Sequence, residues 1–84
     1  MASTVLVVED EDALRDELAY QLEQEGYRVV VAADGAQALE RFRAERPDLV
    51  LLDLMLPELA GTEVTRILRR ESEVPILMLT ARAG

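Results

Sequence analysis

Three acidic residues of this chain occupy positions from which their carboxylates could act together. Glu9 and Asp10 directly follow the apolar run Thr4–Val8, and Asp53 ends the run that begins at Leu49. If both runs are neighbouring parallel strands, about 4.8 Å apart, their carboxyl ends bring the three side chains to one sheet edge. Like charges held that close repel each other, and a hard divalent cation relieves the repulsion. Mg²⁺ suits such a site because it takes one or two carboxylates, a backbone carbonyl and several waters.

A carboxylate in such a site can also accept a phosphoryl group and form an acyl phosphate. Asp53 is the better nucleophile candidate because it ends the central buried strand. An acid that ends a run of aliphatic residues is also costly to bury without a purpose. Glu9 and Asp10 are better placed to hold the metal. Thr80 follows the last apolar run, and its hydroxyl could donate a hydrogen bond to a phosphoryl oxygen. Taken singly, Glu9-Asp10 also fits a solvated turn, and Thr80 fits an ordinary strand residue.

Four apolar runs rich in branched residues predict the strands that must position this cluster. They cover Thr4–Val8, Arg28–Ala32, Asp48–Asp53 and Ile76–Leu79.

Three helical segments separate these runs. The first is expected to begin at Asp12 as N-cap, to bury Leu14, Leu18 and Leu22, and to stop at Gly26. The second follows the cap Asp34-Gly35, carries Ala36, Leu39 and Phe42 at helical spacing, and extends to about Glu45. The third starts near Gly61 and buries Val64, Ile67 and Leu68.

Strands that alternate with helices of this length predict an α/β fold with a doubly wound parallel sheet. A chain of 84 residues forms one domain at most. In such sheets the functional site lies at the carboxyl ends of the strands, which is where the acidic residues fall.

Composition excludes several classes of site and partner. The formal net charge of −8 argues against direct nucleic-acid binding and against an anionic membrane surface. The chain has no His, no Cys and no Lys, since all nine of its cationic residues are Arg. Thiolate metal sites and cysteine nucleophiles are therefore excluded. The start of the chain is not that of a signal peptide, and the apolar runs are too short to span a bilayer, so we expect a cytoplasmic protein.

Three segments of the chain resemble the receiver domain of two-component response regulators. Residues 5–11, Val-Leu-Val-Val-Glu-Asp-Glu, are similar to its first strand and acidic pair. Residues 51–57, Leu-Leu-Asp-Leu-Met-Leu-Pro, followed by Gly61, are similar to its phosphoacceptor strand and loop. Residues 78–82, Met-Leu-Thr-Ala-Arg, are similar to its fourth strand and switch hydroxyl. The residues of the Asp53 and Thr80 segments are most similar to those of the OmpR/PhoB winged-helix class.

The resemblance implies a CheY- and flavodoxin-like sheet with strand order 2-1-3-4. It implies that a sensor histidine kinase phosphorylates Asp53 in the presence of Mg²⁺, to regulate a DNA-binding output domain. Asp10, Asp53 and the backbone carbonyl of Met55 would bind the metal directly, and Glu9 largely through water. Thr80 would follow the phosphoryl group as the switch residue.

Against the family pattern, the chain stops after the fourth strand. The resemblance therefore implies that the fifth strand, the last two helices and the output domain are missing. It also implies that the Lys that normally ends the fifth strand is absent, and Arg82 is a poor substitute. We expect impaired phosphorylation and switching. We also expect either a homodimer or higher assembly through the exposed strand edge and helix face, or a longer protein in which the missing segment exists.

Two other functions are compatible with parts of the pattern. The same fold could act as an interaction or dimerisation module that is never phosphorylated. A small phosphohydrolase of the haloacid-dehalogenase type would need a second acid two residues after Asp53, where the chain has Met55. A dinucleotide-binding domain is disfavoured, because no glycine-rich turn follows the first strand.

Overall fold

A computed structural model describes residues 2–53, 56 and 59–79 of the chain. Within these ranges the strands are β1 (Thr4–Val8), β2 (Arg28–Ala32), β3 (Leu49–Asp53) and β4 (Ile76–Leu79). The helices are α1 (Asp12–Gln24), α2 (Gly35–Glu45) and α3 (Gly61–Glu71). The predicted alternation of strands and helices is confirmed.

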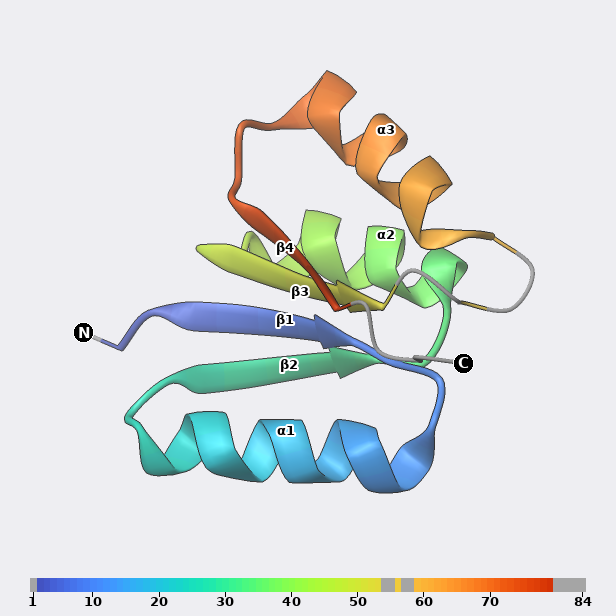
Figure 1. The fold of residues 1–84 in the computed structure, drawn as a ribbon. Coiled ribbons are helices and arrows are strands. Elements are labelled where there is room, and N and C mark those ends of the chain that lie inside the picture. The colour runs from blue at the N-terminus through green and yellow to red at the C-terminus, as the bar shows by residue number, and fades with distance from the viewer. Residues whose placement is uncertain (1, 54–55, 57–58, 80–84) are drawn as a thin grey trace.

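The strands form one parallel sheet with the order β2-β1-β3-β4, as predicted. Figure 1 shows α1 on one face of this sheet and α2 with α3 on the other. Right-handed crossovers between parallel strands place the helices in this way. All four strands point in the same direction, so the segments after β1 and β3 emerge at the same end of the sheet (Figure 1).

The larger core lies between the sheet and the pair α2 and α3. Phe42 of α2 and Val64 and Leu68 of α3 are buried there against Leu6 of β1 and Leu52 of β3. The predicted inner faces of these helices are largely confirmed. Ala36, however, is exposed, and Ala38 takes the buried position. The phase of the helix is fixed by Phe42, and Ala38 lies one turn before it on the same side.

The opposite face holds a smaller cluster around Val5, Val7 and Leu51. Leu18 and Leu22 of α1 pack on it but stay half-buried, as does Leu14. The predicted apolar stripe of α1 is therefore present and only partly covered.

Two predicted helix caps are confirmed and one is wrong. Asp34 caps α2 by accepting a hydrogen bond from Gln37 N at 2.8 Å, and Gly26 follows α1 with φ of +97°. Asp12 is not the N-cap of α1, because that position belongs to Glu11. The carboxylate of Asp12 accepts a bond from Arg15 one turn later (2.6 Å), so it does not bond to the backbone of the first turn.

The third strand begins one residue later than predicted. The backbone N–H of Asp48 bonds to Thr4 O at 2.7 Å, and its carboxylate accepts a bond from Thr4 N at 2.8 Å. Asp48 thus ties the start of β3 to the start of β1 from outside the strand.

Candidate phosphoryl-acceptor and metal site

The strand register brings the ends of β1 and β3 side by side. Val8 of β1 is paired with Leu52 of β3, so the next residues along the two strands are Glu9 and Asp53. Asp53 is in turn paired with Leu79 of β4. Side chains alternate between the two faces along each strand, so residues that are paired across neighbouring strands point to the same face of the sheet.

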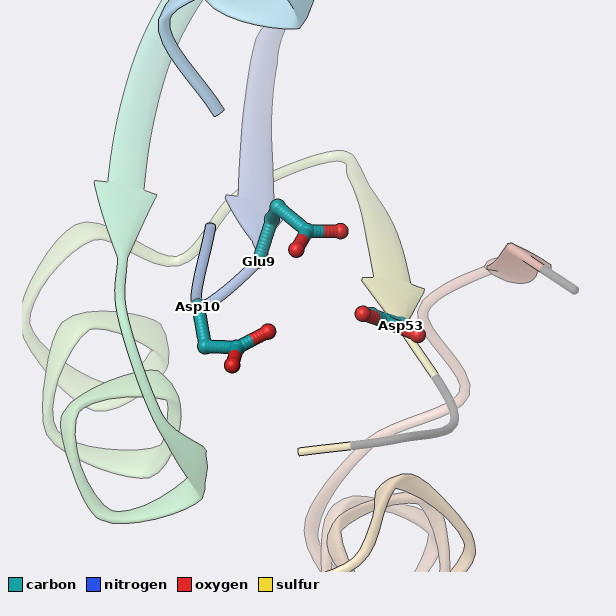
Figure 2. Close-up of side chains that lie close together, drawn as sticks. All are labelled: Glu9, Asp10 and Asp53. Atoms are coloured by element: carbon teal, nitrogen blue, oxygen red, sulfur yellow. The ribbon is translucent and has the colours of Figure 1, made fainter. Parts of the chain in front are cut away.

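Figure 2 shows the carboxylates of Glu9, Asp10 and Asp53 turned toward one another at this end of the sheet. One carboxylate oxygen from each residue lies within 4.8 Å of the others. The three residues that the sequence predicted to converge therefore do converge.

Burial differs among the three acids. Glu9 and Asp53 are 0% exposed, whereas Asp10 is exposed. The cluster is consequently open to solvent on the side of Asp10 and closed by the sheet on the side of Asp53.

The electrostatics of Glu9 reflect this crowding. Burial raises the pKa of Glu9 above its ordinary value, and the adjacent carboxylates of Asp53 and Asp10 raise it further. The backbone N–H of Glu11, which donates to Glu9 Oε2 at 2.9 Å, opposes the rise in pKa. The site therefore holds negative charge at a cost in free energy, which a bound cation would offset.

Backbone contacts hold Glu9 in place. Its N–H donates to Ala32 O of β2 at 3.0 Å, which extends the β1–β2 pairing by one residue. Its carbonyl oxygen accepts a bond from Arg15 Nη1 at 3.0 Å. Arg15 is not among the site residues predicted from the sequence. A cation one turn into the helix that follows the acidic pair is the signal that could have identified it.

Two predicted site residues, Met55 and Thr80, lie outside the described residues, as do Pro57 and Arg82. Their roles remain predictions.

Comparison with known proteins places this geometry in a family. Residues 5–84 match the model of the response regulator receiver domain. The chain belongs to that family. The match takes in both strands that carry the acidic cluster.

Two curated regulators show the extent of the likeness. RegX3 of Mycolicibacterium smegmatis, a sensory transduction protein, is 50% identical over 95% of the chain and 35% of its own length. CseB of Streptomyces coelicolor, a transcriptional regulatory protein, is 51% identical over 94% of the chain and 34% of its own length. Both are regulators of the OmpR/PhoB class. The chain thus spans about a third of the length of these relatives.

Solved receiver structures agree with the fold. The N-terminal domain of a response regulator receiver protein from Methanoculleus marisnigri JR1 has a TM-score of 0.92 at 38% identity, covering 98% of this chain and 69% of that one. The regulator TrrA of Thermotoga maritima, determined in complex with Mg²⁺ and BeF, has a TM-score of 0.90 at 36% identity, covering 96% and 71%. The chain therefore has the receiver fold.

The donor set of this receiver fits Mg²⁺. Two oxygens bound to one Mg²⁺ lie at most about 4.2 Å apart, twice the metal–oxygen distance of ~2.1 Å. Carboxylate oxygens within 4.8 Å need only small side-chain rotations to meet that limit. All three donors are hard oxygens, and Mg²⁺ prefers such ligands.

Within the described ranges, none of the helices has the length and apolar character needed to cross a bilayer.

Proposed function

We propose that residues 1–84 act as a phosphoacceptor domain in two-component signalling, with Asp53 as the residue that is phosphorylated. The observation that carries the proposal is the convergence of Glu9, Asp10 and Asp53 within 4.8 Å at the carboxyl edge of a parallel sheet. Membership of the receiver family supports the same assignment.

In the proposed reaction a carboxylate oxygen of Asp53 attacks the phosphorus of the donor. The new oxygen–phosphorus bond forms an acyl phosphate, and the bond from phosphorus to the donor breaks with its electron pair going to the donor. Bound Mg²⁺ would neutralise charge on the group in transfer. Asp10 and Asp53, with the carbonyl of Met55, would hold the ion directly, and Glu9 would hold it through water. The hydroxyl of Thr80 would bond to a phosphoryl oxygen.

The donor in this proposal is a sensor histidine kinase in the cytoplasm. The domain accepts one phosphoryl group and is not a turnover enzyme. Its phosphorylation would regulate a DNA-binding output domain, and the name of one relative, the transcriptional regulatory protein CseB, is compatible with this. This segment itself would not contact nucleic acid, because its net charge is −8.

We also propose that a second copy of the chain docks along β4. Leu77 is 57% exposed and lies in register beside Leu51, on the face that carries α1. In the described part of the sheet β4 is an outermost strand, and an apolar strand edge favours association. Sedimentation of the chain should show a dimer that Leu77→Lys dissociates, and a monomer at all concentrations would contradict this.

Phosphorylation is tested by incubating the chain with acetyl phosphate, with Mg²⁺ or with EDTA, and locating the added mass by peptide mass spectrometry. We expect labelling of Asp53 that requires Mg²⁺. Asp53→Asn should abolish the labelling, and Asp48→Asn, at the other end of β3, should leave it unchanged. A folded wild-type chain with no more label than Asp53→Asn would contradict the proposal and favour a phosphorylation-independent module.

A further inference from the structure

Arg15 of α1 turns back toward the loop between β1 and α1. Its side chain is only 16% exposed, although it lies in the second turn of a surface helix. Nη1 donates to the carbonyl oxygen of Glu9 at 3.0 Å, and Nη2 donates to Asp12 Oδ1 at 2.6 Å. One guanidinium therefore joins the residue after β1 to the first residue of α1.

The bond to the Glu9 carbonyl has a consequence for Asp10. The peptide unit between them is planar, so fixing the carbonyl of Glu9 also fixes the N–H of Asp10. The N–H and the side chain of Glu9 are already held, by Ala32 O at 3.0 Å and by Glu11 N at 2.9 Å. Arg15 holds the backbone carbonyl of Glu9. The orientation of this carbonyl sets the direction of the chain toward Asp10.

We propose that Arg15 is a positioning residue for the Mg²⁺ site: it holds the Glu9–Asp10 peptide so that the carboxylate of Asp10 faces those of Glu9 and Asp53. This inference rests on the proposed function. Groups that orient metal ligands without touching the metal typically change its affinity by about 10- to 100-fold when removed.

The charge of Arg15 makes the sign of the effect informative. A guanidinium beside a ligand residue repels an incoming divalent cation. If charge were its only effect, removing Arg15 would strengthen Mg²⁺ binding. If Arg15 positions Asp10, its removal weakens binding in spite of the lost repulsion.

The test compares the Mg²⁺ dissociation constants of wild type and three variants at about 0.15 M salt, where exposed charges more than about 8 Å away are largely screened. Binding is followed by the amide chemical shifts of Glu9 to Glu11, and the urea midpoint of each metal-free variant is measured in parallel. Arg15→Met removes the charge and both bonds while keeping a long helix-forming side chain. Arg15→Lys keeps the charge but not the planar fork that reaches two acceptors. Asp12→Asn is the matched control, since it neutralises the exposed partner of Arg15 and leaves Glu9 alone.

We expect about tenfold weaker binding for Arg15→Met, weaker binding for Arg15→Lys, and a change of less than about twofold for Asp12→Asn. The amide shift of Glu11 in the metal-free protein should move in both Arg15 variants. Unchanged or tighter binding by Arg15→Met, or wild-type affinity in Arg15→Lys, would overturn the role of Arg15. Should Arg15→Met not fold, Arg15→Lys alone decides between geometry and charge. Failure of the wild type itself to bind Mg²⁺ would instead contradict the proposed function.

Discussion

At the amino ends of the strands, the carboxylate of Asp48 accepts a bond from Thr4 N at 2.8 Å, and Glu45 pairs with Arg28 at 2.9 Å. At the carboxyl ends, three carboxylates face one another within 4.8 Å, and the nearby Arg15 directs Nη1 to a backbone carbonyl. At the amino end each of these acids lies beside a donor from a residue far along the chain. At the carboxyl end three carboxylates lie together, and that of Glu9 accepts a bond from the nearby Glu11 N.

The two ends also use glycine for different reasons. Gly26, before β2, has φ of +97°, a conformation that side chains disfavour, and a Cβ added there would have no described atom within 4 Å. Gly35, after β2, needs no positive φ. A Cβ there would lie 2.7 Å from Leu59 Cβ and 3.0 Å from Leu59 O, in the segment that follows β3. Gly26 at the amino end is therefore required by its backbone conformation. Gly35 at the carboxyl end is required by the lack of space beside Leu59.

The largest effect should come from Gly35→Ala. We expect a loss of about 2 kcal/mol in the free energy of unfolding, because overpacking forces neighbouring atoms apart. Urea denaturation measures the change. Adding Leu59→Gly removes the closest contact and should recover part of the loss in a double-mutant cycle. Gly26→Ala, which also destabilises, should show no coupling to Leu59→Gly, and equal coupling in both cycles would break the contrast between the two glycines.

The next effect should come from Asp48→Ala at the amino end. It leaves the N–H of Thr4, a residue only 9% exposed, without its acceptor, and we expect a loss of about 1.5 kcal/mol. The same urea experiment reports it. Mg²⁺ affinity serves as the control and should not change, since Asp48 lies at the opposite end of β3. A weaker metal site in this variant would show that the two ends are not independent.

Glu9→Gln at the carboxyl end should have the opposite sign. Removing one buried charge from the cluster should stabilise the metal-free protein by about 1 kcal/mol at neutral pH. A glutamine carbonyl can still accept the bond from Glu11 N. Mg²⁺ should bind the variant less tightly. Added Mg²⁺ should therefore raise the free energy of unfolding by less than it does in the wild type. Destabilisation of the metal-free variant would mean that the carboxylate of Glu9 stabilises the fold, as we expect for that of Asp48.

The smallest effect is a pH dependence of the difference in free energy of unfolding between Glu9→Gln and the wild type. The folded protein raises the pKa of Glu9 above its ordinary value of 4.5. At a pH between 4.5 and the raised pKa, Glu9 therefore binds more protons in the folded state than in the unfolded state. The free energy contributed by Glu9 falls as pH rises through this window. The advantage of Glu9→Gln over wild type in the absence of metal should accordingly grow from pH 4.5 upward, as measured by urea midpoints. A constant difference would contradict the pKa shift.

Much of this architecture was predictable because it depends on periodicity and on chain order. The bounds of β1, β2 and β4 follow from continuous apolar runs. Because a helix separates each strand from the next, the strands are expected to be parallel. The convergence of Glu9, Asp10 and Asp53 follows from the same rule, since the carboxyl ends of parallel strands lie on one edge.

Other features depend on contacts between residues far apart in the chain, which spacing does not report. Gly35 looks like a turn glycine in sequence, and only its approach to Leu59 shows that space, not φ, requires it. Asp48 seemed the first residue of a strand, and Thr4, 44 positions away, makes it a tie between two strands.

The chain by itself therefore determined which residues can do chemistry and at which edge they meet, because residue type and period are local properties. The tertiary structure decided how those residues are held. It assigned Asp12 to Arg15 instead of the helix cap, and it brought Arg15 to the carbonyl of Glu9. Such choices depend on which of several possible partners is within hydrogen-bond reach, and that is fixed only when the elements pack.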